Sequence, residues 1–231
     1  MKLSIVVPAL NESANIATTL VSLQSLRASG HEVIVVDGGS SDDTANVAKA
    51  FSDHVLTSPM GRSRQMNAGA ARARGDVLLF LHADTLPPKM CATLIEDALS
   101  GNTHHWGRFD VQLSGSHVML RVVERLMNWR SRLTSIATGD QAIFVRRELF
   151  VRCGGFPDIP LMEDVALCKL LKRRGAPANL RERVVTSSRQ WERRGIINTI
   201  VLMWRLRLEY ALGVDPQRLY QRYYGSDNAV S

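Results

Sequence analysis

The sequence predicts an α/β fold of Rossmann-like type, in which helices flank a mostly parallel sheet. Short apolar runs alternate with longer amphipathic stretches through the first 81 residues, and this alternation is typical of successive βα units. Gly, Asp and Pro residues separate the runs. A helical crossover joins strands that run parallel, so both faces of the sheet should be covered. Of the 231 residues, 45% are hydrophobic, which is sufficient for one packed domain.

The first two strands are predicted at residues 3–7 and 33–36, each a short apolar run. A second helix follows through residues 47–51, with capping and acidic first-turn residues at 41–43. The helix between the two strands carries one apolar stripe, formed by Ile16, Leu20, Leu23 and Leu26.

The next units are a short strand at 54–56, a helix of small residues at 63–74 and a buried strand at 77–81. His82, Ala83, Asp84 and Thr85 follow this strand, and two prolines then stop the chain. Ligands of open α/β sheets bind at the carboxyl ends of strands, so Asp84 is a candidate for contact with a ligand or metal. A turn or helix cap is the alternative interpretation of this Asp.

Three loops with carboxylates are predicted at strand ends, at residues 8–12, 37–42 and 82–85. Each could be a simple turn with a helix cap. Together at one edge of the sheet they would repel, unless a cation or a hydrogen-bonding ligand lies among them. Arg62 and Arg64 supply positive charge nearby. Neither a dinucleotide-binding glycine motif nor a P-loop follows the first strand.

The second half of the chain is less regular. An alternating strand is predicted at 106–113, either beside an acceptor or as an ordinary sheet strand. The helix predicted at 118–133 has Leu126 and Leu133 among its apolar residues and four arginines on its polar side. Glu163 and Asp164 precede a helical run at 165–171, as caps or as catalytic groups. The helix predicted at 196–212 is too charged and too short to cross a bilayer, and we expect it to pack onto the domain.

The net charge of +7 indicates anionic partners, such as nucleotide phosphates or an anionic membrane surface. The chain has no aromatic RNA-binding motif, basic tail or paired zinc ligands, which argues against nucleic acid. Three widely spaced cysteines suit the reduced thiols of a cytoplasmic protein. Pro8, Asn11 and Glu12 interrupt the N-terminal apolar run before it could form a signal peptide.

Five ordered motifs between Leu3 and Gly175 resemble those of glycosyltransferase family 2, which has the GT-A fold. They are Ile5–Glu12, Val35–Asp42, Gly61–Gly69, Phe80–Asp84, and Gly154-Gly155-Phe156 with Met162-Glu163-Asp164. The fourth resembles the Asp-x-Asp metal motif of the family, but His82 stands at its first position. Within the family the chain most resembles a small bacterial subgroup of bare catalytic domains.

The resemblance implies a nucleotide-sugar donor, UDP-linked, and an Mg²⁺ or Mn²⁺ ion held by Asp84. It implies that Asp37 accepts the N3 hydrogen of uracil and that Arg62 approaches the base or phosphate. Asp164 would be the general base, with Glu163 orienting it or the acceptor. The full implied nucleotide-binding set is Pro8, Asn11, Glu12, Asp37, Gly38, Arg62 and His82.

Residues 190–194 resemble the Gln-x-x-Arg-Trp motif of processive family members, with Arg194 in place of Trp. The alternative interpretation, which we favour from the sequence alone, is a polar helix start. No channel helices follow in the sequence, so we expect a single-transfer enzyme. The candidate acceptor or diphosphate contacts are Gln190, Arg193, Arg194 and Trp106.

The sequence therefore predicts one GT-A-like domain that transfers a sugar with inversion to an unidentified acceptor, lipid-linked or polysaccharide. Residues 1–100 would bind the nucleotide sugar, 101–190 the acceptor, and 191–231 would form a helical C-terminal extension. The basic helices predict loose attachment to the inner face of an anionic membrane, with a soluble acceptor as the alternative. The alternative functions are a non-catalytic nucleotide or polyanion binder and a sugar nucleotidyltransferase. The latter would require a glycine-rich phosphate loop after the first strand, which residues 8–12 do not provide.

Overall fold

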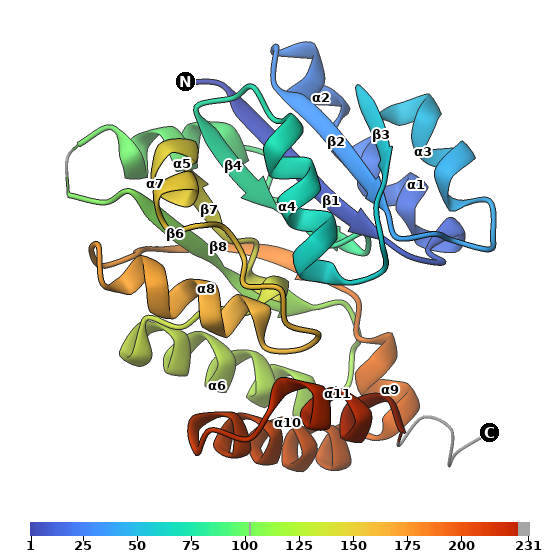
Figure 1. Ribbon diagram of the computed structural model, residues 1–231, viewed down its shortest axis with the longest axis vertical. Helices are drawn as coiled ribbons and strands as arrows, with labels where there is room; N and C mark the ends of the chain where they lie inside the picture. Colours follow the sequence, from blue (N-terminus) through green and yellow to red (C-terminus); the bar gives the residue numbers. More distant parts are fainter. Residues whose placement is uncertain (102, 226–231) are drawn as a thin grey trace.

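The protein forms an eight-stranded mixed sheet with helices on both faces (Figure 1). The computed structural model describes residues 1–101 and 103–225. The strand order is β3-β2-β1-β4-β7-β6-β8-β5. The first half of the sheet is parallel, and the second half contains the antiparallel neighbours.

The parallel half confirms the predicted βα succession. β1 (Leu3–Ala9) lies between β2 (Glu32–Asp37) and β4 (Val77–Phe80), and β3 (His54–Thr57) forms the edge. The connecting helices are α1 (Ser13–Ser22), α2 (Gln24–Ala28), α3 (Thr44–Phe51) and α4 (Arg62–Arg72). β1, β2 and β4 are buried on both faces because helices cover each side, which explains why they are largely continuous apolar runs.

Alternate residues of the strands pack into two separate hydrophobic cores, one on each face of the sheet. Ile5 and Val7 of β1 face α1, α2, α3 and α5 (Cys91–Leu99), whereas Val6 faces α4, α7 (Arg147–Arg152) and α8 (Glu163–Lys172). The predicted stripe of Ile16, Leu20, Leu23 and Leu26 is buried in the first core, although Leu23 separates two helices.

The second half of the sheet contains β6 (Trp106–Leu113), which pairs in parallel with β8 (Ala178–Thr186). The short β7 (Phe144–Arg146) lies antiparallel between β4 and β6, and β5 (Thr85–Leu86) pairs with β8. The sequence did not predict β8, because its centre carries three exposed charged residues at 181–183 that hide the strand pattern.

The helix α6 (Val118–Thr134) buries polar as well as apolar side chains. Asn128 and Glu124 are buried against β6 together with Leu120 and Val123, whereas Leu126 and Leu133 are exposed. The reason is that β7 pairs only with Trp106 and Gly107 at the start of β6. Asn128 exchanges hydrogen bonds with the backbone N–H and C=O of Val111, and Glu124 accepts from the Leu113 N–H. The α6 side chains therefore satisfy the strand edge that β7 leaves free.

The C-terminal part is helical, as predicted. It contains α9 (Arg189–Arg194), α10 (Ile196–Ala211) and α11 (Pro216–Gly225). Leu206 of α10 and Leu219 of α11 pack on Met162 and Val165, which flank the two carboxylates at the start of α8. The predicted packing of α10 onto the domain is thus observed for one of its faces.

Candidate functional site

The loops after β1 and β2 are joined by side-chain hydrogen bonds. Asn11 adopts a left-handed conformation with φ of 53°, its N–H donates to Ser40 Oγ at 2.9 Å, and its Oδ1 accepts from the Ser41 N–H at 2.8 Å. Asp37 accepts hydrogen bonds from the N–H groups of Gly39 and Ser40, and also from the Ser40 hydroxyl. The predicted nucleotide loops therefore form one unit, and the Asp37 carboxylate, almost wholly buried, organises it.

Two other predicted residues of this region have clear local roles. Pro8 lies beyond Val6, the last β1 residue that pairs with β4, so its missing N–H removes no bond from that ladder. Gly38 is approached by the α4 side chain Gln65, whose amide donates to the carbonyls of Ala9 and Val36. A Cβ at position 38 would lie 3.1 Å from this amide group, so the small residue keeps β1, β2 and α4 close together.

The loop after β4 meets the first loop through an arginine. Arg189, at the start of α9, donates to Glu12 Oε2 at 3.1 Å and to Asp84 Oδ2 at 3.3 Å. The Asp84 carbonyl accepts from the Ser187 N–H, which ties the loop to the end of β8. The predicted cluster of acidic loops thus exists, and the cation between two of its carboxylates is a guanidinium from the C-terminal part of the chain.

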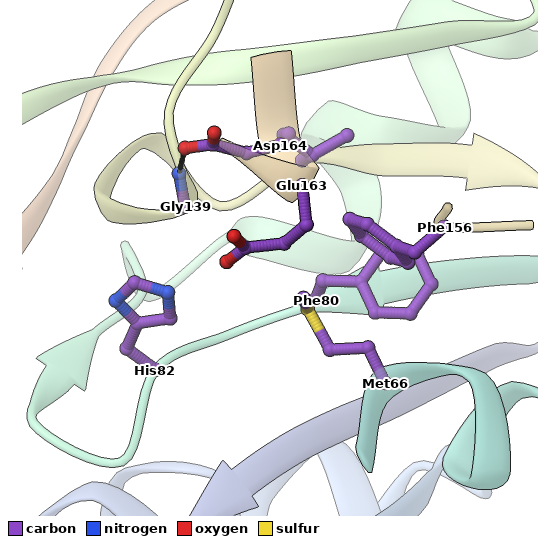
Figure 2. A pocket seen from close by; sticks show the side chains of 8 residues that line it. Met66, Phe80, His82, Gly139, Phe156, Glu163 and Asp164 are labelled. Carbon is purple, nitrogen blue, oxygen red and sulfur yellow. Dashed lines mark hydrogen bonds between the residues drawn. The ribbon is translucent and has the colours of Figure 1, made fainter. Parts of the chain in front are cut away.

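His82 points into a small pocket between β4 and the start of α8 (Figure 2). Its Nδ1 lies 3.4 Å from Asp140 Oδ1, in the short helical turn η1 (Gly139–Gln141). A Cβ at Gly139 would lie 2.3 Å from His82 Nε2, so only glycine permits the imidazole to sit there. His82 is therefore on the side of the site that contains Glu163 and Asp164.

Glu163 and Asp164 have different environments in the first turn of α8. The Glu163 carboxylate points into the pocket between His82 and the apolar side chains of Met66 and Phe80 (Figure 2). Asp164 Oδ2 accepts from the Gly139 N–H at 2.9 Å, and its Oδ1 accepts from the Val165 N–H at 2.6 Å. The N-cap of α8 is Met162, with φ of 68° and no side-chain cap, so neither carboxylate occupies the cap position.

Burial raises the pKa of Glu163 to about 7, the charge of Asp164 adds to the rise, and Arg62 opposes it. The pKa of Asp164 is also raised by burial, against the hydrogen bonds from Gly139 and Val165. Two neighbouring carboxyl groups with raised pKa values in a pocket are typical of proton transfer. The charge of each group affects the pKa of the other, so the two are expected to titrate as a pair.

We expect Glu163→Gln to stabilise the protein above pH 7. A carboxyl pKa raised from 4.5 to about 7 means that the folded state prefers the protonated form, so stability falls as pH rises through that range. Gln has nearly the same shape without the charge, and the gain should be at most about 3 kcal/mol. Melting temperatures at pH 5 and pH 8 test this, with a benefit only at pH 8.

The matched control is Glu148→Gln, because Glu148 lies 82% exposed on α7. It should leave the melting temperature unchanged at both pH values. A lower melting temperature of Glu163→Gln at pH 8 would show instead that the Glu163 charge is stabilised by partners such as Arg62.

The structure distributes the remaining predicted residues unevenly. Arg62 is exposed at the start of α4, where its charge acts on both Glu163 and Asp140. Trp106 is 1% exposed, its indole N–H donates to the Gly175 carbonyl, and it belongs to the core at the opposite end of β6. We therefore leave Trp106 out of the acceptor site.

The predicted residues of α9 also differ in exposure and in contacts. Gln190 and Arg193 are exposed. Arg194 stacks on the Tyr223 ring at 4.2 Å and donates to the Tyr223 carbonyl, so it joins α9 to α11. The neighbouring Arg189, which sequence reasoning missed, contacts the strand-end carboxylates of Glu12 and Asp84.

Two further residues were missed because no motif marks them. Asp140 faces His82, and although burial works against its charge, its pKa is lowered by His82, Arg62 and Arg130. Arg130 of α6 has a pKa lowered by burial, and Asp164 and Asp140 counteract that effect. The described part of the chain therefore surrounds its candidate catalytic carboxylates with three basic side chains.

Asp84 fits a divalent cation that arrives together with a diphosphate. Among residues 1–101 and 103–225, no three His, Cys, Asp or Glu side chains are grouped as a metal cage. Mg²⁺ commonly uses one or two protein carboxylates and takes its other ligands from phosphates and water. The Asp84 carboxylate is only partly buried, and its positive partner is an exposed arginine that can move aside. The Asp84 carboxylate provides hard oxygen ligands, which Mg²⁺ and Mn²⁺ prefer.

Solved structures share the fold of this chain. The protein resembles S. aureus TarS 1-349 in complex with UDP-GlcNAc, with a TM-score of 0.64 and 18% identity over 81% of this chain and 58% of that one. It also resembles glucosyl-3-phosphoglycerate synthase from Mycobacterium tuberculosis in complex with Mn²⁺, UDP and glucosyl-3-phosphoglycerate. That match has a TM-score of 0.60 and 24% identity over 80% of this chain and 70% of that one. The fold is the GT-A fold of glycosyltransferases.

The family model "Glycosyl transferase family 2" matches residues 4–152, and the chain belongs to this family of glycosyltransferases. It is 29% identical to "Probable glycosyltransferase YdaM" of Bacillus subtilis (strain 168) over 92% of this chain. It is 27% identical to an "Uncharacterized glycosyltransferase" of Haemophilus influenzae over 66% of this chain. The chain spans 55% of the length of each of these relatives.

Proposed function

We propose that the protein transfers a sugar from a UDP-sugar to a hydroxyl group of its acceptor, with inversion at the anomeric carbon. The observation that carries the proposal is the pairing of two sites at one edge of the sheet. Asp37 ends β2, Asp84 lies in the loop after β4, and His82 of that same loop lines one pocket with the raised-pKa pair Glu163 and Asp164. A donor site and a proton acceptor would thus lie next to each other.

The nucleoside half of the donor would be held by the unit of Asn11 and Asp37. Asp37 Oδ2 accepts from two backbone N–H groups, whereas the one donor to Oδ1 among the described residues is the Ser40 hydroxyl. A carboxylate oxygen has two lone pairs, so Oδ1 keeps one for the N3 hydrogen of uracil. Adenine has no ring N–H on its Watson–Crick edge, so this acceptor favours uracil over adenine.

Asp84 would hold the metal ion, which when bound would neutralise the charge that develops on the departing diphosphate. Arg189 would be released from Asp84 and would become free to contact the diphosphate, since guanidinium groups suit phosphate oxygens. Glu12 would keep the other hydrogen bond of Arg189 and hold it near the loop.

Asp164 would remove the acceptor proton. Inverting transfer requires a base on the face of the sugar opposite the diphosphate, within reach of the acceptor hydroxyl. The N–H groups of Gly139 and Val165 fix the Asp164 carboxylate, and burial raises its proton affinity. Glu163, beside it, would share the proton and orient the acceptor.

The test of donor recognition is calorimetry with UDP, ADP and GDP, each with and without Mn²⁺. We expect UDP to bind best and Mn²⁺ to strengthen it. Asp37→Ala should weaken uridine binding about 5- to 100-fold even without metal, because it removes a charged acceptor and loosens the Asn11–Ser40 unit. Equal affinity for the three nucleotides, or an Asp37→Ala variant that binds uridine like wild type, would contradict the assignment.

Asp53→Ala is the matched control. Asp53 also accepts from a backbone N–H at one end of β2, that of Val33, but at the opposite end of the strand from Asp37. It should leave nucleotide affinity unchanged.

A further inference from the structure

The helices α6 and α10 pack side by side and leave an apolar surface uncovered. Ile196 and Ile200 of α10 pack with Leu120, Val123 and Met127 of α6, and Figure 1 shows the pair as the outer layer below the sheet. Ten large apolar residues are between 40% and 76% exposed here, nine of them on the two helices and the tenth, Leu212, directly after α10. We call them the α6–α10 surface: Val118, Val122, Leu126, Trp129, Leu133, Ile197, Val201, Trp204, Leu208 and Leu212.

The surface is built from two regular stripes. Successive members are three or four residues apart on each helix, which is the spacing of one helical face. The α6 stripe is opposite the residues that bind the free edge of β6, and the α10 stripe is opposite the side that packs on α8 and α11. Each stripe faces outward because the other side of its helix packs against the rest of the protein.

Scattered exposed apolar residues are normal on any protein, whereas continuous stripes on neighbouring helices mark an interaction surface. Each stripe has a tryptophan near its middle or C-terminal half, Trp129 and Trp204, both more than 60% exposed. Tryptophan is the side chain most suited to the boundary between water and lipid, because its ring is apolar and its N–H is polar.

Arginines border the stripes. The two helices contain six arginines and two glutamates, with no lysine or aspartate. Both glutamates are paired with arginines, Glu124 with Arg121 and Glu209 with Arg205. Arg125 and Arg205 are exposed beside the α6 and α10 stripes respectively. The surface is thus apolar in its middle and positive at its rim, which complements anionic lipid head groups.

We propose that the α6–α10 surface docks the protein onto an anionic lipid bilayer, with both helices lying in the plane of the head groups. Among the described residues, no helix has the length and hydropathy needed to cross a membrane. The docked helices would insert Trp129, Trp204 and their apolar neighbours between the acyl chains, while Arg125 and Arg205 contact lipid phosphates.

The docking surface is close to the candidate base. The packed face of α10 contacts Met162 and Val165, the residues on either side of Glu163 and Asp164. One helix therefore separates the carboxylate pair from the bilayer, which would bring a membrane-borne acceptor within reach of the site. The docking itself does not depend on the transfer reaction, so it can be measured without a donor or an acceptor.

The test is co-sedimentation with vesicles of phosphatidylcholine alone and of equal parts phosphatidylcholine and phosphatidylglycerol, at low salt. Wild type should bind the anionic vesicles and release at high salt. The double variant Trp129→Ser, Trp204→Ser should bind at least about tenfold more weakly, because it removes two inserted aromatic rings. Arg125→Gln should weaken binding by about fivefold at low salt.

Matched controls come from the opposite side of the molecule. The double variant Val21→Ser, Val151→Ser removes exposed apolar residues of α1 and α7, and Arg152→Gln removes an exposed arginine of α7. Both should bind like wild type.

Vesicles with brominated acyl chains should quench tryptophan fluorescence in wild type. Quenching should be lost in Trp129→Phe, Trp204→Phe, which keeps Trp106 and Trp191.

Three results would overturn the proposal. The first is equal binding of wild type to neutral and anionic vesicles, or no binding to either. The second is unchanged binding and quenching in the tryptophan variants. The third is a wild-type dimer in sedimentation equilibrium that the Trp129→Ser, Trp204→Ser substitutions dissociate, since a second copy of the chain would then cover the surface.

Discussion

Asp164→Asn is expected to reduce turnover by about 10²- to 10⁴-fold while UDP affinity and metal response stay close to wild type. Asn keeps the size of the side chain, and its Oδ1 can still accept from the Gly139 or Val165 N–H. It cannot take up the acceptor proton. The loss should therefore be in the chemical step and not in donor binding.

Initial rates, UDP affinity and melting temperature must be measured together on the same preparation. Asp158→Asn is the control, because Asp158 is exposed near the start of α4 and pairs with Arg64. It should retain normal turnover. Near-normal turnover of Asp164→Asn would remove Asp164 as the base and move attention to Glu163, whose carboxylate points into the same pocket.

The pH dependence of the rate provides an independent check. The base must be unprotonated, so activity should fall as pH decreases through the raised pKa of the Glu163–Asp164 pair. Both raised values place this fall above the range of ordinary carboxyl groups.

Much of the first half of the fold could be predicted from the sequence, because β1, β2 and β4 are buried on both faces by helices. Burial of that kind requires continuous apolar runs, and Val33–Val36 and Val77–Leu81 stand out on that account. The second half could not be predicted in the same way. β8 carries exposed charges in its centre, and β7 has three residues, so neither has a readable period.

The orientation of α6 shows a second limit of pattern reasoning. Amphipathic periodicity shows that a helix has two faces, but the environment decides which face is buried. Here the buried partner is an open strand edge with unpaired backbone groups. Asn128 and Glu124 satisfy that edge, and the apolar stripe with Leu126 is left outside.

The candidate site was predictable where chemistry is carried by a local motif. Asp37, Asp84 and the Glu163–Asp164 pair lie at element ends that the sequence marks with Gly and Pro. Arg189 and Asp140 are brought in by long-range packing, from the end of β8 and from the turn after α6. No spacing in the sequence connects Arg189 with Asp84, 105 residues earlier.

Asp84→Ala is expected to abolish the strengthening of UDP binding by Mn²⁺ or Mg²⁺ and to lower turnover by at least about 100-fold, since a catalytic metal supplies several kcal/mol. A weak metal-independent nucleoside affinity should remain, because the Asp37 unit is separate from the loop after β4. The effect of Asp84→Ala should also differ from that of Asp37→Ala, which weakens the binding of uridine itself.

Arg189→Gln separates the metal role of Asp84 from its ion pair. Arg189 is half exposed and binds Asp84 at 3.3 Å, so the pair is worth at most about 1 kcal/mol. Its removal frees the Asp84 carboxylate, and the Mn²⁺ concentration that gives half of the enhancement should fall by no more than about fivefold. Because the two substitutions break the same ion pair, opposite effects on the metal response show that the effect of Asp84→Ala does not come from loss of that pair. If Asp84→Ala responded to metal like wild type, the ligand would have to be sought elsewhere, beginning with Glu12, the other partner of Arg189.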